Sequence, residues 1–275
     1  MSTGSAPVHR AAVLGKPIAH SLSPVIHNAG YAAAGLTGWT YGAVECAESE
    51  LADLVAGLGP EWAGLSLTMP LKEVALAVAG AVSPVAAAIG AANTLVPDGP
   101  GWRAENTDAP AMVDTLAAVG VVAAGRVAVL GAGGTARAAV AAARDLGAEV
   151  TVYARRPDSI AALRPVAAVL GVSMRGTGWA DVARCADADV VISTVPGGVA
   201  DEVVAAIRWR PTAVLLDAVY DPWPTPLAAA AAAAGCPIVS GLDLLLAQAV
   251  RQFGLFTHRP APVAQMRAAL TAARR

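Results

Sequence analysis

Cysteine and histidine are scarce in this sequence, and neither residue type is clustered. The three cysteines, Cys46, Cys185 and Cys236, are odd in number and far apart, which argues against a disulfide framework and against a zinc site. The four histidines also lack the spacing of metal ligands. We therefore expect buried thiols, surface imidazoles and no metal cofactor.

Charged residues are also few, and no segment has the charge pattern of a leader or of a nucleic-acid-binding protein. They make up 15% of the chain against 56% hydrophobic residues, and a chain of this composition is not disordered as a whole. The net charge of −2 offers no basic surface for nucleic acid. Met1–Arg10 has no basic segment followed by an apolar core, and the uncharged stretch Val74–Pro97 is interrupted by glycine and proline. We expect a cytoplasmic protein without a membrane span.

The length of 275 residues fits two domains, and the second half alternates between apolar runs and helix-favouring segments. Such alternation predicts a parallel sheet with right-handed crossovers. The strands expected there are Val127–Leu130, Glu149–Tyr153, Val190–Thr194, Ala213–Asp217 and Pro237–Val239, with a weaker signal near Val172–Met174. The first half predicts strands Ala11–Leu14, Trp39–Cys46 and Glu61–Leu67 and a hairpin of Ala91–Val96 with Trp102–Ala104. Expected helices are Glu48–Leu58, Ala109–Val119, Ala228–Ala234, one ending at Phe256 and Ala264–Arg275.

The segment Val127–Ala139 has the form of a strand, a glycine turn and a helix N-terminus. Gly131, Gly133 and Ala136 fill the three small positions of the dinucleotide-binding pattern G-x-G-x-x-G/A. Free N–H groups and the dipole at the start of the helix favour a phosphate. The alternative is an ordinary glycine-rich turn, but the flanking strand and helix favour a dinucleotide.

The end of the next expected strand indicates which nicotinamide cofactor binds. NAD-binding folds usually carry an acidic residue there, which bonds the ribose hydroxyls. This chain instead continues into Arg155 and Arg156. Guanidinium groups bind a 2′-phosphate through charge-assisted hydrogen bonds. The pattern therefore predicts NADP(H), although two solvated loop charges are the alternative.

Lysine occurs only at positions 16 and 72, and Lys72 falls at a corner between a strand and a helix. Because arginine serves nearly every other basic position, we interpret Lys72 as a titratable amine kept for chemistry rather than as a solvated surface charge. Ser23-Pro24 marks a helix start, so Ser23 either caps the helix or joins Ser21 in holding a small anion. Asn106 or Thr107 could cap the helix that follows, and Asp108 could favour its dipole.

These separated motifs together resemble those of the shikimate dehydrogenase family over nearly the whole chain. The matching segments are Gly15–Asn28, Leu67–Lys72, Gly90–Leu95, Asn106–Asp108, Gly131–Thr135, Ala154–Ser159, Asp217–Tyr220 and Gly241–Gln248. The resemblance implies a catalytic pair, Lys72 and Asp108. It implies that substrate is bound by Ser21, Ser23, Thr68, Asn93, Asp108, Tyr220 and Gln248. It also implies that the cofactor is bound by Gly131, Ala132, Gly133, Gly134, Thr135, Ala154, Arg155, Arg156, Ala218 and Gly241.

The family further implies an α/β architecture and a reaction. An N-terminal α/β substrate domain, residues 1–107 with the returning C-terminal helices 241–275, would face a Rossmann-type doubly wound NADP domain at 108–240 across a cleft. The implied activity is the reversible NADPH-dependent reduction of 3-dehydroshikimate to shikimate, a step of chorismate and aromatic amino-acid biosynthesis, by a monomer or homodimer. The alternatives are a quinate/shikimate dehydrogenase of broader specificity and a non-catalytic, metabolite-binding regulatory homologue.

Five positions depart from the family pattern, and one of them is Arg156, which stands where a threonine is usual. Ser66 stands where an asparagine usually bonds substrate, and Ala154 stands where an asparagine usually precedes the arginine. Pro84 and Ala218 replace residues that are commonly acidic and methionine, respectively. The departure at Ser66 leaves one substrate hydrogen bond without a donor or acceptor of the usual kind.

Overall fold

The computed structural model describes residues 8–274, which divide between two compact units. The first unit comprises Met1–Thr107 and Gln248–Arg275, and the second comprises Asp108–Ala247. The division falls within the 17-residue helix α10 (Gly241–Thr257). Residues 1–7, part of the segment inspected for a leader, and Arg275, the expected end of the last helix, lie outside the described residues.

The first unit is built on a mixed six-stranded sheet in the order β2-β1-β3-β5-β6-β4. Its strands are β1 (His9–Gly15), β2 (Trp39–Glu45), β3 (Trp62–Leu67), β4 (Ala81–Val82), β5 (Thr94–Asp98) and β6 (Gly101–Glu105). Strands β2, β1 and β3 are parallel, whereas β5 and β6 form the expected antiparallel hairpin. The short strand β4, which pairs with β6, was not predicted because two residues give no periodicity.

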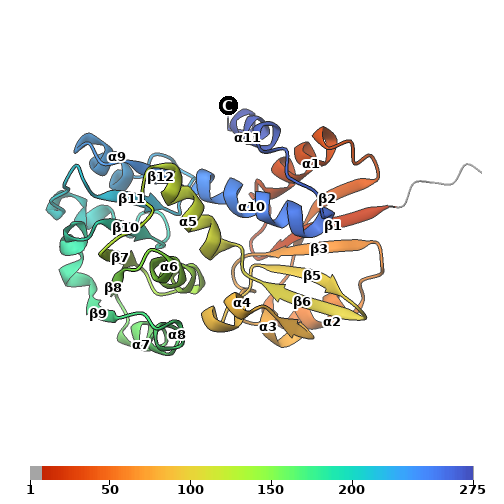
Figure 1. The fold of residues 1–275 in the computed structure, drawn as a ribbon, viewed down its shortest axis with the longest axis horizontal. Helices are drawn as coiled ribbons and strands as arrows, with labels where there is room; N and C mark the ends of the chain where they lie inside the picture. Colours follow the sequence, from red (N-terminus) through yellow and green to blue (C-terminus); the bar gives the residue numbers. More distant parts are fainter. Residues whose placement is uncertain (1–7, 275) are drawn as a thin grey trace, which may run out of the picture. The chain divides into compact units, whose positions relative to one another are not determined.

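The helices of the first unit cover an aliphatic core that includes Leu14, Leu51, Leu65, Leu71 and Leu95. They are α1 (Ser23–Ala33), η1 (Glu48–Glu50), α2 (Leu51–Ala56), α3 (Ala75–Val78), α4 (Pro84–Ile89) and α11 (Val263–Ala272). The helix expected at Glu48–Leu58 is thus a 3₁₀ turn followed by a short α-helix. Helix α1 buries positions three and four residues apart and packs against α11 (Figure 1).

The second unit contains a wholly parallel six-stranded sheet in the order β12-β11-β10-β7-β8-β9. Its strands are β7 (Arg126–Leu130), β8 (Glu149–Ala154), β9 (Met174–Gly178), β10 (Val190–Ser193), β11 (Val214–Asp217) and β12 (Ile238–Ser240). This strand order is that of a doubly wound fold, with its reversal between β7 and β10. The predicted parallel sheet is confirmed, and the weak sixth strand begins at Met174.

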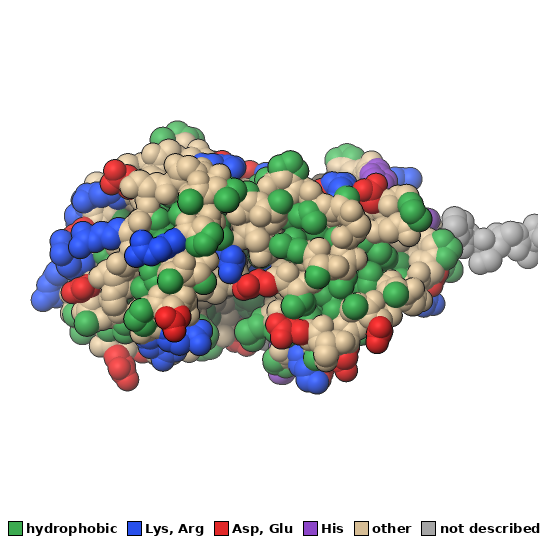
Figure 2. All heavy atoms as spheres, turned by 90° about the horizontal axis from the view of Figure 1, so that it is seen from below, with side chains coloured by type: hydrophobic (Ala, Val, Ile, Leu, Met, Phe, Trp, Pro, Cys, Tyr) green, Lys and Arg blue, Asp and Glu red, His purple; other side chains and the backbone are tan. Residues whose placement is uncertain are grey.

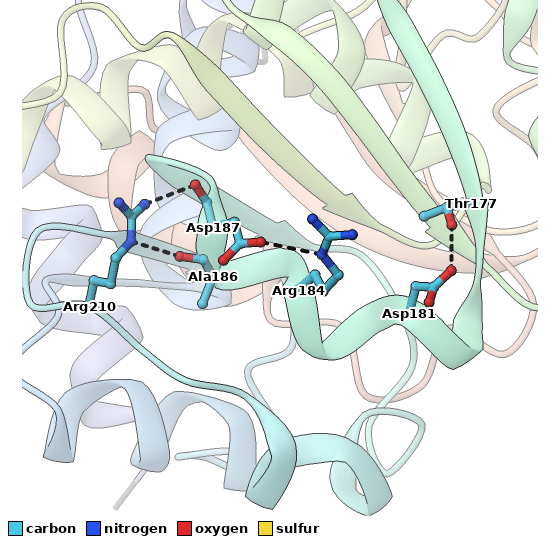
Figure 3. A network of polar contacts seen from close by, with 6 residues as sticks. All are labelled: Thr177, Asp181, Arg184, Ala186, Asp187 and Arg210. Atoms are coloured by element: carbon cyan, nitrogen blue, oxygen red, sulfur yellow. Dashed lines mark hydrogen bonds and ion pairs between the residues drawn. The ribbon is translucent and has the colours of Figure 1, made fainter.

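In the second unit, α5 (Asp108–Ala118) precedes the first strand of the sheet. The crossovers between the strands are α6 (Gly134–Asp145), α7 (Pro157–Ala161), α8 (Arg164–Leu170), η2 (Trp179–Asp187), η3 (Asp201–Ala206) and α9 (Pro226–Ala233). Arg210 fixes the end of η2, because its guanidinium donates to the carbonyl oxygens of Ala186 and Asp187 at 3.0 Å (Figure 3). It also donates to the carbonyl oxygen of Ala188 at 2.8 Å. Within η2, Arg184 lies 3.5 Å from Asp187, and Thr177 of β9 bonds Asp181 (Figure 3). The crossover is therefore held by polar contacts as well as by its apolar face.

Arginine side chains gather over the second unit on the face drawn in Figure 2, whereas both lysines belong to the first unit. The first unit exposes more apolar atoms on the same face (Figure 2). Among residues 8–274, no helix is long and apolar enough to cross a membrane. All three cysteines are buried and free, as expected.

Candidate functional site

The substrate-site residues expected in the first unit gather where strands β1 and β3 end. The carboxyl ends of parallel strands meet at one sheet edge, which is where α/β folds collect ligands. Thr68 follows β3 directly, and its N–H donates to Leu14 O at 2.9 Å. Lys72 lies in the turn after β3 and is half-buried, and its carbonyl oxygen accepts a 2.7 Å hydrogen bond from the N–H of Ala92. The lysine turn is thereby tied to the segment that carries Asn93.

Ser23 does not cap helix α1, so the capping interpretation was wrong. The N-cap residue is Leu22, and no side chain accepts a capping hydrogen bond there. At two other helix starts with proline in the first turn, the preceding hydroxyl does cap: Ser83 accepts from Ala86 N at 3.3 Å and Thr225 accepts from Ala228 N at 3.0 Å. The hydroxyl of Ser23 is therefore left for other partners, with Ser21 beside it accepting from Ser23 N at 3.3 Å.

A chain of buried hydrogen bonds links three strands and helix α10 behind these serines. The Tyr41 hydroxyl donates to Ser66 Oγ at 2.6 Å, and Ser66 Oγ donates to Gln252 Oε1 at 2.7 Å. Gln252 Nε2 donates to Thr94 Oγ1 at 2.9 Å and to Asn93 O at 3.2 Å. Ser66, one of the residues that depart from the family pattern, thus has a hydrogen-bond partner within the protein on both sides.

Asn93 is the centre of a second set of hydrogen bonds. Its Nδ2 donates to Thr107 Oγ1 at 2.8 Å, and its Oδ1 accepts from Thr107 N at 2.8 Å and from Thr94 Oγ1 at 2.9 Å. Asn106 donates in turn to Ala91 O at 3.0 Å. These bonds anchor the chain immediately before Asp108, which is the buried first residue of α5. The side chains of Asn106 and Thr107 therefore have a structural role in holding this segment.

Burial keeps the aromatic side chains beside the Tyr41–Ser66–Gln252 hydrogen bonds uncharged. Burial lowers the pKa of His27 to about 3, and the side chain of Gln252 offsets part of that shift. Burial also raises the pKa of Tyr41 well above its ordinary value, against the hydrogen bonds that it makes with Ser66 and Ser23. The two rings stack with centroids 4.1 Å apart and an interplanar angle of 4°. His27 is fully buried, so the expectation of a surface imidazole was wrong there, because α1 turns this position inward.

The dinucleotide-binding turn of the second unit has the geometry that its glycines predict. Gly131 has φ +104°, and a Cβ there would lie 2.6 Å from Thr194 Oγ1. Gly133 is the N-cap residue of α6, and a Cβ there would meet nothing within 4 Å. Ala136 is fully buried against the sheet. The first position needs glycine, the second leaves the helix N-terminus open, and the third packs the helix.

Arg155 and Arg156 extend from the end of β8, next to this turn. Leu130 and Tyr153 are partners in the β7–β8 register, and Gly131 N donates to Tyr153 O at 2.9 Å. Ala154 is buried, whereas both arginines are exposed. The two guanidinium groups therefore leave the sheet at the edge to which the N-terminus of α6 also points.

The loop after β11 carries Ala218 and Tyr220. Asp217 is buried at the end of the strand, where it accepts hydrogen bonds from Thr225 Oγ1 at 2.7 Å and from Val219 N at 3.2 Å. Burial raises the pKa of Asp217, and these hydrogen bonds oppose the shift. Burial also raises the pKa of Tyr220. Gly241, the first residue of α10, approaches the backbone of Ala218 so closely that a Cβ would clash with it.

Sequence reasoning missed Tyr41, Gln252, Asp217 and Thr225. Gln252 is four residues after Gln248 in α10, so helical spacing places both on one face. This spacing in the sequence could have predicted that Gln252 lies near Gln248. Tyr41 had no such signal, because its partner Ser66 is 25 positions away on another strand. The described residues contain no cluster of three or more His, Cys, Asp or Glu side chains suited to a metal ion.

Three family models match the chain in succession. Residues 13–95 match the shikimate dehydrogenase substrate binding domain, and residues 241–271 match the shikimate 5′-dehydrogenase C-terminal domain. Residues 103–218, which include the glycine turn, match the C-terminal domain of alanine dehydrogenase/PNT. The matches follow the order of the motifs along the sequence.

Comparisons with whole proteins agree with the family models. A curated shikimate dehydrogenase (NADP(+)) of Anaeromyxobacter dehalogenans is 40% identical over 270 residues, covering 94% of this chain and 95% of its own. The crystal structure of the Mycobacterium tuberculosis shikimate dehydrogenase is 46% identical with a TM-score of 0.87, covering 96% of this chain and 99% of that one. That of the Thermus thermophilus enzyme, in complex with NADP(H) and shikimate, is 32% identical with a TM-score of 0.85, covering 97% and 100%. The chain belongs to the shikimate dehydrogenase family.

Proposed function

We propose that this protein is an NADP-dependent shikimate dehydrogenase that interconverts 3-dehydroshikimate and shikimate. The observation that carries the proposal is the gathering of Ser23, Thr68, Lys72 and Asn93 near the carboxyl ends of the parallel strands β1 and β3. This set joins hydroxyls, an amide and one amine, which suits a small polyhydroxylated acid. Relatives of the same family are curated as shikimate dehydrogenases (NADP(+)) over nearly their whole length.

The residues of the second unit fit NADP. The open space at Gly133 lets a pyrophosphate approach the N-terminus of α6, where N–H groups and the helix dipole favour negative charge. Arg155 and Arg156 would hold the 2′-phosphate, and Ala132, Gly134, Thr135, Ala154, Ala218 and Gly241 would line the rest of the cofactor site. When bound, NADPH supplies the hydride that reduces the substrate carbonyl carbon.

On the substrate side, Ser21 and Ser23 would donate to the carboxylate, and Thr68, Asn93, Tyr220 and Gln248 would bond the ring hydroxyls. Lys72 would give a proton to the carbonyl oxygen in reduction and take it back in oxidation, with Asp108 as its carboxylate partner. We also propose a cytoplasmic enzyme that acts as a monomer or homodimer. The site residues are proposed from the family resemblance and from their placement within each unit.

An absorbance assay at the NADPH band tests the activity and its rivals together. Shikimate and quinate are each supplied with NADP and with NAD, and we expect turnover with shikimate and NADP to exceed the other three combinations. Comparable rates with quinate would establish the broader quinate/shikimate activity. The absence of turnover with every combination would favour a metabolite-binding protein and overturn the proposal.

Lys72→Ala tests the assigned proton transfer. General acid–base groups contribute about 10²–10⁴-fold, so kcat should fall by that order while the Kd for NADP changes little. Lys16→Ala is the matched control, because Lys16 is the other lysine and pairs with Glu45 at an exposed site. A Lys72→Ala enzyme that kept near-full turnover would remove this lysine from the mechanism.

A further inference from the structure

Gln252 is fully buried in helix α10, and three of its neighbours bond its side-chain amide. One of these neighbours is the backbone carbonyl of Asn93, which can only accept a hydrogen bond. The Nε2 end of the amide must therefore face Asn93, and the Oε1 end must face Ser66. Because Oε1 can only accept, the hydroxyl proton of Ser66 is committed to Gln252.

The orientation of the Gln252 amide fixes which hydroxyl donates and which accepts in the rest of the hydrogen-bonded chain. Ser66 Oγ has used its proton and so accepts from Tyr41, whose own proton is then committed to Ser66. The Tyr41 oxygen can then offer only a lone pair to the Ser23 hydroxyl, whose interaction with Tyr41 opposes the rise in the Tyr41 pKa. The Ser23 hydroxyl is consequently always the donor, either to Tyr41 or to an anion that displaces this bond.

The Tyr41 hydroxyl is held rigidly enough for such a role. Its ring stacks on His27, and its backbone N–H and C=O both bond the Asn28 side-chain amide at 2.9 Å. At the other end of the chain, Gln252 also bonds Thr94, whose hydroxyl donates to Asn93 Oδ1. One side-chain amide thus connects the serine edge of the site to its asparagine edge.

We propose that Gln252 is a positioning residue for substrate recognition, which acts through Ser66 and Tyr41 to keep the Ser23 hydroxyl a donor toward the substrate carboxylate and through Thr94 to orient Asn93. Gln252 itself does not contact substrate. The proposal rests on the proposed function in one respect, namely that shikimate is the carboxylate recognised.

Gln252→Glu is the sharpest test, because it replaces the Nε2 donor with an oxygen of nearly the same size. A carboxylate would set an anionic acceptor against the Asn93 carbonyl, whereas protonation of the new group restores a donor. At pH 8 we expect the KM for shikimate to rise about tenfold or more, with kcat within about threefold and the KM for NADP unchanged. Relative to wild type at each pH, the defect should shrink as the pH falls to 6.

The titratable side chains beside the new carboxyl are His27 and Tyr41, and burial keeps both neutral over this range. Gln265→Glu is the matched control, since it makes the same change at an exposed position of α11. A KM for shikimate equal to wild type, or a defect that does not vary with pH, would overturn the role assigned to Gln252.

Tyr41→Phe gives a second test that needs no new charge. Without the Tyr41 hydroxyl, neither Ser66 nor Ser23 is oriented by it, so the KM for shikimate should rise about two- to tenfold at every pH, the effect typical of one hydrogen bond. Tyr31→Phe is its control, because Tyr31 is a buried tyrosine of the same unit whose hydroxyl makes no hydrogen bond within residues 8–274. Equal effects of the two substitutions would show a general packing defect and contradict the proposal.

Calorimetric titration of shikimate into each protein separates this inference from the proposed function. Absence of wild-type turnover would overturn the proposed function, while the pattern of shikimate Kd values would still test Gln252. A wild-type protein that neither turns over nor binds shikimate would overturn both.

Discussion

The preference for NADP over NAD provides a quantitative prediction from two exposed side chains. Arg155 and Arg156 follow β8 at the sheet edge that carries the Gly131 turn, and neither guanidinium is buried. A hydrogen bond to a charged group contributes about 1.5–3 kcal/mol, and solvent exposure places each arginine at the lower end of that range. Since about 1.4 kcal/mol is a factor of ten, losing one arginine should weaken NADP binding about tenfold.

Arg155→Ala should therefore raise the KM for NADP about tenfold and leave the KM for NAD nearly unchanged. The effect should shrink at high salt, because exposed charges are screened over about 8 Å at physiological ionic strength. Arg155→Asp should also lower the KM for NAD, since an acidic residue at this position bonds the ribose hydroxyls. Each KM is measured by NADPH or NADH absorbance at saturating shikimate.

Arg164→Ala serves as the control for the loss of a positive charge, because Arg164 is an exposed arginine of the same unit that begins α8. It should leave both KM values unchanged. If Arg155→Ala kept the ratio of NADP to NAD affinities, the arginine pair would not recognise the 2′-phosphate. The cofactor assignment to these residues would then be refuted.

Two further predictions concern the second unit. Gly131→Ala should lower the free energy of unfolding, measured in urea, by about 1–3 kcal/mol, because φ is +104° and the new Cβ would lie 2.6 Å from Thr194 Oγ1. At Gly133 a new Cβ would meet nothing within 4 Å, so Gly133→Ala should change stability much less but raise the KM for NADP. Burial raises the pKa of Asp217 above 3.8, so the folded state binds more protons and this group's contribution to stability falls as pH rises above that value. Urea unfolding between pH 4 and 7 should show that Asp217→Asn removes this decline, and an unchanged slope would contradict the assignment.

Most of the fold could be predicted from local sequence patterns. The parallel strands of the second unit follow from short apolar runs at regular intervals, and the β5–β6 hairpin follows from the Gly/Pro-rich turn between two apolar segments. Local pattern failed for the two-residue strand β4 and for the helix expected at Glu48–Leu58, which is shorter and begins as a 3₁₀ turn. Elements of so few residues are set by their neighbours rather than by periodicity.

The sequence also predicts which groups carry chemistry, since residue type and local spacing are sufficient for such a prediction. The Gly131 turn, the arginines after β8, and Lys72 at a strand end can each be recognised within about ten residues. The hydroxyl of Ser23 could not be assigned in this way, because its availability depends on whether the helix that it begins is capped.

What only the tertiary structure decided is how distant polar groups satisfy one another. Ser66 and Gln252 are 186 positions apart, yet a 2.7 Å hydrogen bond joins them in the interior. Buried polar groups must find partners, and the folded chain selects those partners from whatever strands and helices meet there. The sequence by itself therefore determined most of the elements and the cofactor signature, and it predicted Lys72 as the reactive amine. The packing of α10 against the first sheet decided how Ser66 is accommodated and which hydroxyl donates to which neighbour.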